Sequence, residues 1–192
     1  MRKDDEMIGY ALCGSFCTIE ASLGVMEKMV NSGHEIVPIM SERVYETDTR
    51  FFSAENLRRR IRTLCGRDII HTVEAAEPLG PKLVLSSLIV APCTGNSLAK
   101  LAGGITDSAV TMAMKAHLRC DRPLLIALAS NDAMSQNLGN IGALLSRKSV
   151  YFVPMRQDDP SKKPHSLVAD FDGLIPAYEA MCRGVQIRPL FV

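Results

Sequence analysis

The sequence has no tryptophan, only 5% aromatic residues and no excess of charge of either sign. Its 22 lysines and arginines nearly balance 21 aspartates and glutamates, which leaves a formal charge of +1. Proteins that bind nucleic acid carry a basic surface and often stack bases on aromatic rings, so we expect no nucleic-acid partner. The longest strongly apolar stretch, residues 83–91, is far shorter than the roughly 20 residues of a membrane-spanning helix, so no membrane partner is expected.

The six cysteines show no paired spacing, and the charged segment 1–7 lacks the apolar core of a signal peptide. Thiols of a protein that is not exported stay reduced, so the sequence predicts free cysteines and a cytoplasmic location. No grouping of histidine, cysteine and carboxylate residues has the spacing of metal ligands, so no metal site is expected.

Short apolar runs alternate along the chain with patterns of helical period. The expected strands are residues 8–13, 35–40, 88–91, 123–129 and 150–153. The expected helices are residues 19–30, 53–64, 96–101, 108–118, 139–147 and 167–182. This alternation predicts a single α/β domain over residues 1–192, doubly wound like Rossmann or flavodoxin folds, with three layers and a mainly parallel sheet.

Three local features refine this prediction. Pro38 inside the second apolar run indicates an edge strand or a bulge, because proline has no N–H for a central ladder. Asp107 is expected to cap the helix over residues 108–118. The polar, proline-bearing stretch 155–164 predicts a loop, and we expect residues 155–166 to close over a site or to bind another protein chain.

Ligands of doubly wound domains bind at the carboxyl ends of the strands, so the loops there hold the candidate site. Gly14, Ser15 and Phe16 follow the first strand and open a helix, whose free N–H groups suit a phosphate. The loop has neither the Walker pattern nor GxGxxG, so it does not specifically indicate a nucleoside triphosphate or a dinucleotide. Taken alone, a capped helix start with nothing bound explains it at least as well.

Two further strand ends carry polar residues. Ser41 follows the second strand, where a simple turn residue is the plainer interpretation. Thr94, Asn96 and Ser97 surround Gly95 after the strand at residues 88–91. A helix cap needs one such side chain, so three of them around a glycine that permits close approach favour a bound ligand.

These motifs together resemble the FMN-binding flavoproteins of the cysteine decarboxylase type, whose motif Pro-Ala-Ser/Thr-Ala-Asn corresponds to Pro-Cys-Thr-Gly-Asn here. The resemblance runs from residue 8 to about residue 147. It implies that FMN is held by Gly14, Ser15, Phe16, Ser41, Thr94, Gly95, Asn96 and Ser97. It also implies His71 as the catalytic histidine, although a structural histidine is an equal alternative. Asn131 and Met134 remain from a motif that clamps the substrate carboxylate, whereas its proline, first methionine and tryptophan are missing from residues 128–135. The resemblance implies that Asn131 binds the carboxylate.

Residues 91–101 and 157–169 resemble one branch of this family more specifically. Its members are oxidoreductase subunits of spore-forming bacteria that convert dihydrodipicolinate to dipicolinate during sporulation. The resemblance implies a second polypeptide, the A subunit of the enzyme, which carries NADP or NAD. It also implies a small dicarboxylate substrate, a homo-oligomer and little activity for this chain alone. The alternatives are a flavin-dependent decarboxylase of a cysteine-like substrate and a non-catalytic scaffold that keeps the fold.

A run of arginines at positions 58–60, with Arg62 and Arg67, forms a basic patch on one expected helix. Arginine binds carboxylates with paired hydrogen bonds, so the patch could hold a dianionic substrate or an acidic partner. A solvated helix face is the preferred interpretation.

Overall fold

The computed structural model describes residues 7–80 and 82–192. The charged segment 1–7, which lacks the apolar core of a signal peptide, therefore lies outside the described residues, apart from Met7. Within the described residues, seven strands form one sheet in the order β2-β1-β3-β4-β7-β6, and β5 pairs with β4 off this path. The parallel strands are β1 (Met7–Leu12), β2 (Glu35–Met40), β3 (Ser87–Cys93), β4 (Leu124–Ser130) and β5 (Val150–Phe152). Two short strands, β7 (Leu167–Ala169) and β6 (Met155–Arg156), extend the sheet in antiparallel fashion.

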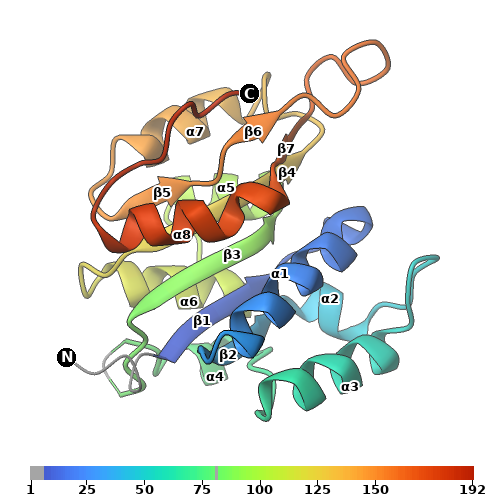
Figure 1. Cartoon of the computed structure of the whole chain (residues 1–192), viewed down its shortest axis with the longest axis vertical. Coiled ribbons are helices and arrows are strands. Elements are labelled where there is room, and N and C mark those ends of the chain that lie inside the picture. The colour runs from blue at the N-terminus through green and yellow to red at the C-terminus, as the bar shows by residue number, and fades with distance from the viewer. Residues whose placement is uncertain (1–6, 81) are drawn as a thin grey trace.

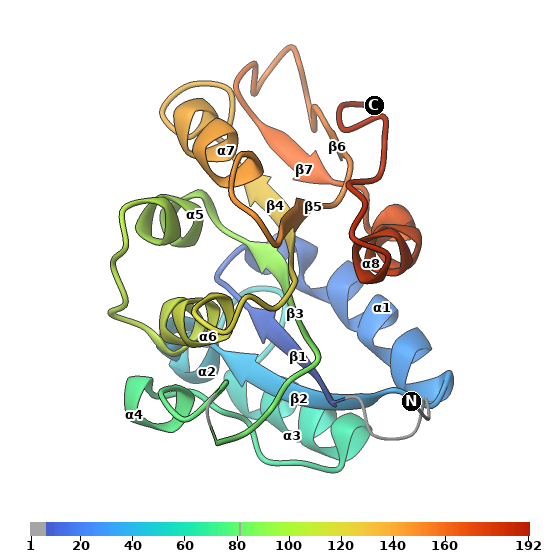
Figure 2. The same ribbon diagram turned by 90° about the vertical axis from the view of Figure 1, so that its left-hand side faces the viewer.

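Helices cover both faces of the sheet, as Figures 1 and 2 show. One hydrophobic cluster joins the sheet to α1 (Ile19–Asn31), α2 (Glu42–Glu46), α3 (Ala54–Cys65) and α8 (Leu174–Cys182). The other joins it to α4 (Val73–Ala76), α5 (Gly95–Ala102), α6 (Ala109–Leu118) and α7 (Leu138–Leu145). β3 is buried along its whole length because both of its faces are covered, which explains its continuous apolar run. The predicted three-layer fold with a mainly parallel sheet is confirmed.

β2 is an edge strand, as Pro38 predicted. Beyond it, Ile70 N donates to the Pro38 carbonyl at 3.0 Å and Met40 N donates to the Ile70 carbonyl at 2.8 Å. The Pro38 carbonyl thus points away from β1, and the nitrogen of the same residue points to the same side. The missing N–H of this proline therefore costs no hydrogen bond between β2 and β1.

The predicted helix over residues 167–182 is wrong in its first half. Residues 167–169 form β7, a short 3₁₀ turn covers Phe171–Gly173, and α8 begins only at Leu174. Helical spacing of apolar residues does not distinguish a three-residue strand from a first helical turn, and pairing with β4 and β6 decides for the strand. The loop predicted over residues 155–164 also starts later than expected, because Met155 and Arg156 form β6.

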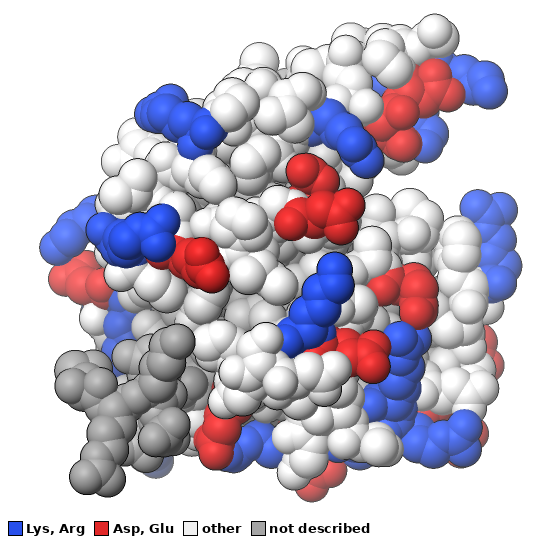
Figure 3. All heavy atoms as spheres, viewed as in Figure 1, with Lys and Arg blue, Asp and Glu red and all other residues white. Residues whose placement is uncertain are grey.

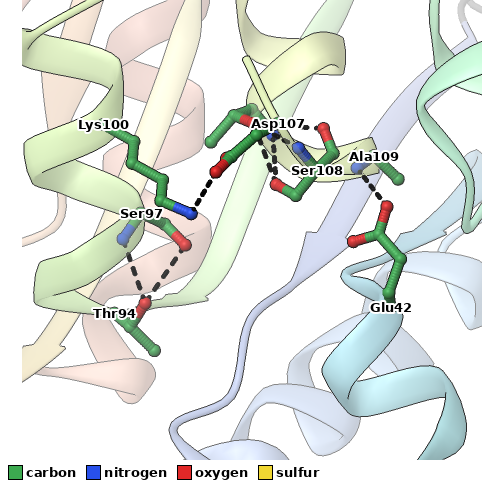
Figure 4. A network of polar contacts seen from close by, with 8 residues as sticks. Glu42, Thr94, Ser97, Lys100, Asp107, Ser108 and Ala109 are labelled. Carbon is green, nitrogen blue, oxygen red and sulfur yellow. Dashed lines mark hydrogen bonds and ion pairs between the residues drawn. The ribbon is translucent and has the colours of Figure 1, made fainter. Parts of the chain in front are cut away.

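Asp107 does not cap α6. Ser108 is the N-cap, and it exchanges hydrogen bonds with Thr111 in a capping box. Asp107 instead forms an ion pair with Lys100 of α5 at 2.8 Å, and Glu42 of α2 accepts a hydrogen bond from the Ala109 N–H at 3.0 Å (Figure 4). The start of α6 is thus bonded to both α5 and α2.

His117, near the end of α6, is completely buried. Desolvation lowers its pKa to about 4, so the imidazole is neutral at neutral pH. Its Nε2 lies 2.9 Å from the Pro123 carbonyl oxygen and donates to it in the neutral form. This histidine is a structural residue.

Within residues 7–80 and 82–192, no helix combines the length and apolarity needed to cross a membrane.

Candidate functional site

A cavity of about 520 Å³ opens at the carboxyl edge of the parallel strands. The loops that follow β1, β3 and β4 form its floor and walls, together with the α2–α3 connection and the β6–β7 loop. Its lining residues are Gly14, Ser15, Phe16, Cys17, Thr18, Arg50, Phe51, Thr94, Gly95, Asn96, Ala129, Ser130, Asn131, Asp132, Asp158, Lys163 and Val168. The cavity lies where a doubly wound sheet places its ligand.

The loop after β1 supplies the first wall. Residues 16–18 form a 3₁₀ turn that runs directly into α1, so the loop lies at the amino end of a long helix. Ser15 N donates to the Cys13 carbonyl at 2.9 Å, and Thr18 Oγ1 donates to the Ser15 carbonyl at 2.9 Å. N–H groups of a first helical turn have no acceptor within the helix, so this wall favours an anion.

The loop after β3 supplies a second helix start. Thr94 is the N-cap of α5: its Oγ1 accepts from Ser97 N at 3.2 Å and donates to Ser97 Oγ at 3.1 Å (Figure 4). Gly95 and Asn96 then form the first turn beside the cavity. A Cβ on Gly95 would collide with Ser130 Oγ and lie 2.7 Å from Asp132 Oδ1, so any other residue would have to displace this hydrogen-bonded pair.

The loop after β4 supplies a fixed negative charge. Ser130 Oγ donates to Asp132 Oδ1, and Asn137 Nδ2 donates to the same oxygen at 3.0 Å. These hydrogen bonds, that from Ser130 foremost, lower the pKa of Asp132, which is therefore a carboxylate at neutral pH. Asn131 lies between these residues and also lines the cavity.

Three residues predicted for the site do not line the cavity. Ser97 is directed to Thr94, as described above. The Ser41 hydroxyl is buried at the end of β2 with no hydrogen-bond partner among the described residues. The His71 ring is stacked on Tyr45, with centroids 3.6 Å apart and planes 5° apart, and its Nδ1 lies 3.2 Å from the Ile69 carbonyl oxygen.

The structure therefore brings seven predicted residues together. They are Gly14, Ser15, Phe16, Thr94, Gly95, Asn96 and Asn131. The roles assigned to them, and to Ser41, Ser97 and His71, remain predictions. Sequence reasoning missed Arg50, Phe51, Asp158 and Lys163 as lining residues; only the mixed charge of the 155–166 loop gave any signal.

Two thiols lie immediately beneath the first two walls. Cys13 and Cys93 are buried at the ends of β1 and β3, and neither forms a disulfide, as predicted. Cys93 Sγ donates to the Thr94 carbonyl at 3.6 Å. The neighbouring Cys93 thiol lowers the pKa of Cys13, whereas the neighbouring Cys13 and burial raise the pKa of Cys93 well above its usual range. Both stay within the hydrophobic core rather than in the cavity lining.

The arginine patch of α3 and its flank is engaged within the protein. Arg60 pairs with Glu20 at 2.8 Å and Arg67 with Glu35 at 2.9 Å. Arg58 donates to the Tyr45 carbonyl and lies 4.7 Å above the Tyr45 ring. None of these arginines lines the cavity. Their partners are residues of this chain, and the Arg60 and Arg67 pairs lie on the surface, as the preferred interpretation of a solvated helix face implies.

A second, smaller cavity of about 210 Å³ lies at the opposite ends of α5, α6 and α7. Its cations are Lys115, Arg119 and Arg147, which stand near helix carboxyl ends and there offset the helix dipoles. In the part of the chain that the structure describes, no group of three or more histidine, cysteine, aspartate or glutamate side chains could hold a metal ion.

Comparison with known proteins identifies the family of this fold. The flavoprotein family model matches residues 2–170, which is most of the chain. The chain belongs to the flavoprotein family. The resemblance inferred from the Gly-Ser and Pro-Cys-Thr-Gly-Asn loops is thereby confirmed.

This flavoprotein is 43% identical to the B subunit of dipicolinate synthase from Bacillus subtilis (strain 168) over 185 residues, covering 96% of this chain and 92% of that protein. Its structure matches that of the dipicolinate synthase B subunit from Bacillus halodurans C with a TM-score of 0.90 and 38% identity, over 100% and 98% of the two chains. The FMN-dependent cysteine decarboxylase SpaF matches with a TM-score of 0.68 and 21% identity, over 94% and 98%, and shows the shared fold.

Proposed function

We propose that this flavoprotein is the B subunit of a dipicolinate synthase. It acts in the cytoplasm with a nicotinamide-binding A subunit to oxidise dihydrodipicolinate to dipicolinate during sporulation. The observation that carries this proposal is the 43% identity to the Bacillus subtilis protein over nearly the full length of both chains. The 157–169 segment, which carries the more specific resemblance, contributes Asp158, Lys163 and Val168 to the cavity lining.

FMN is the cofactor we propose for the cavity, and the residues present fit it. Gly14 and Phe16 offer backbone N–H groups and Ser15 offers its hydroxyl to a phosphate, and Gly95 and Asn96 offer a second helix start. Ser41 has a buried hydroxyl free of any partner in the described chain, close to where β2 ends. Bound FMN would supply hydride-accepting chemistry.

The remaining lining residues would orient the substrate and control its protons. Asp132 presents a carboxylate fixed by Ser130 and Asn137, and Asn131 presents both a donor and an acceptor beside it. Groups held this rigidly can orient a substrate without first having to be ordered themselves. Such orientation can account for a large part of the lowering of an activation barrier.

The reaction explains why a second polypeptide is expected. Aromatising a dihydropyridine removes two electrons and two protons, as one hydride and one proton. The sequence has no GxGxxG fingerprint for a dinucleotide. The nicotinamide, NADP or NAD, therefore belongs on the A subunit in this proposal.

The test is to assay dihydrodipicolinate oxidation with NADP or NAD, using this chain alone, the A subunit on its own and the mixture. We expect the mixture to be active and this chain alone to be nearly inactive. Full activity of this chain alone would refute the two-subunit scheme, and full activity of the A subunit without this chain would favour a scaffold. The visible absorption spectrum of the purified chain tests FMN, and light scattering tests the homo-oligomer that belongs to the same proposal.

A further inference from the structure

Two cationic side chains line the cavity from segments outside the strand-end loops. Arg50 lies in the connection between α2 and α3, and Lys163 lies in the loop between β6 and β7. Figure 1 shows the β6–β7 loop overhanging the carboxyl edge and the α2–α3 connection below it, and Figure 3 shows the surface notched between them. The two cations thus belong to opposite sides of the opening.

Arg50 is exposed and has no ion-pair partner among the residues that the structure describes. Its guanidinium lies 4.8 Å from the Phe51 ring, a contact that leaves the N–H edge open. A guanidinium carries five N–H donors in a fixed fork that matches carboxylate and phosphate oxygens. Arg50 is therefore available to an oxyanion.

Lys163 is held in place by its own loop. Its backbone N–H donates to the Asp159 carbonyl at 2.7 Å, and the His165 carbonyl accepts from Met134 N at 2.9 Å, which ties the loop to the segment after β4. Its ammonium pairs with Asp158, which raises the pKa of Lys163 and keeps it charged at neutral pH. An ammonium has three donors, so this pair leaves others for a ligand.

The acidic residues of the lining do not neutralise both cations. Asp132 accepts from Ser130 and Asn137, and Asp158 is paired with Lys163. A ligand with oxyanion groups would find Arg50 free and Lys163 with unused donors. We propose that Arg50 and Lys163 together form an oxyanion receptor, binding carboxylate or phosphate groups of the cavity's ligand from its two sides.

The oxyanion could come from two sources, and this part of the inference rests on the proposed function. One source is the dicarboxylate substrate, and the other is the phosphate of FMN. Both share the chemistry that an arginine fork and an ammonium recognise, so the experiment has to separate them.

The variants are Arg50→Gln and Lys163→Gln, which remove charge and keep polar side chains of similar shape. Matched controls are Arg59→Gln on the exposed face of α3 and Lys162→Gln, the neighbour of Lys163 outside the lining. Calorimetry measures dipicolinate against picolinate, which has one carboxylate, and fluorescence titration measures FMN against riboflavin. Loss of a charge-assisted hydrogen bond predicts affinity about 10-fold lower or more.

Weaker dipicolinate binding with unchanged FMN binding assigns the receptor to the substrate. Weaker FMN binding with unchanged riboflavin binding assigns it to the phosphate. The inference is wrong if both variants bind these ligands like the controls, or if riboflavin weakens as much as FMN.

Inorganic phosphate separates this inference from the proposed function. Suppose the wild-type chain binds neither dipicolinate nor FMN. Thermal stabilisation by phosphate, compared with chloride at equal ionic strength and lost in both variants, would then support the receptor, while the failed binding of FMN and dipicolinate would count against the cofactor and substrate of the proposed function. An absence of any phosphate effect on the wild-type chain in that case would overturn the receptor.

Discussion

Helix α3 and the cavity at the carboxyl edge both carry arginine, but the two regions use it differently. On α3, Arg60 has a carboxylate partner and Arg58 has a carbonyl and a ring within the chain. In the cavity, Arg50 lacks an ion-pair partner among the described residues. The densest run of arginines therefore lies outside the cavity, and the arginine without an ion-pair partner lines it. We expect the availability of a charged group, more than its density along the sequence, to indicate where a ligand binds.

The same contrast extends to uncharged groups. Groups with partners inside the chain should contribute to stability, and groups that line the cavity without partners should contribute to binding. A substitution at one such group should therefore change either the free energy of unfolding or the affinity for a ligand, and leave the other unchanged.

The largest effect is expected at His117, whose Nε2 is satisfied by Pro123. Its folded pKa of about 4 lies below the ordinary 6.5, so the unfolded chain takes up a proton first as the pH falls. Its contribution is complete above pH 6.5 and is lost between 6.5 and 4, reaching about 3 kcal/mol. Urea unfolding across this window should show that loss in the wild type and not in His117→Gln.

Other groups titrate at the low end of the window, so the informative quantity is the difference between variant and wild type. His165→Gln, at an exposed position, serves as the control and should follow the wild type. If His117→Gln loses as much stability as the wild type between pH 6.5 and 4, this histidine does not control the pH dependence of stability.

The next effect is expected for Ser15→Asp, which places a negative charge where the first-turn N–H groups face the cavity. Repulsion of a phosphate should weaken FMN binding on the order of 100-fold. Fluorescence titration with FMN measures this. Ser32→Asp adds the same charge at the opposite end of α1 and should leave FMN binding unchanged. Unaltered FMN affinity in Ser15→Asp would remove the phosphate from this loop.

Gly95→Ala should lower the free energy of unfolding by about 1–3 kcal/mol, because its Cβ would overlap the Ser130–Asp132 pair. Gly142→Ala is the matched change in α7, where no atom lies within 4 Å of the added carbon. There the better helix propensity of alanine should raise stability by about 0.5–1 kcal/mol. Chemical unfolding of both variants measures the contrast, and equal effects would contradict it.

Arg60→Ala should give the smallest effect. Both partners of the Arg60–Glu20 pair are largely exposed, so its loss should cost about 0.5 kcal/mol or less. The difference should shrink further at high salt, where exposed charges are screened. FMN binding should not change; a clear loss of FMN affinity would return α3 to the functional surface.

Local sequence signals predicted the fold because they act over a few residues. Continuous apolar runs gave β1, β3 and β4, and Pro38 gave the edge position of β2. Such signals fail where pairing between distant segments determines the secondary structure. Residues 167–169 were predicted to be helical, but they form β7 because they pair with β4. They also fail to choose between two adjacent candidates for one N-cap: the sequence predicted Asp107, and the N-cap of α6 is Ser108.

The sequence by itself determined the two helix starts of the site, Gly14–Ser15 and Thr94–Gly95–Asn96. Parallel strands bring their carboxyl ends to one edge, so residues that follow such strands meet there whatever the loops do. Only the tertiary structure placed Arg50 and Lys163 at the same cavity and gave Arg60 and Arg67 their partners. Those choices depend on how long side chains from separate loops reach one another in space, and no spacing along the chain encodes that distance.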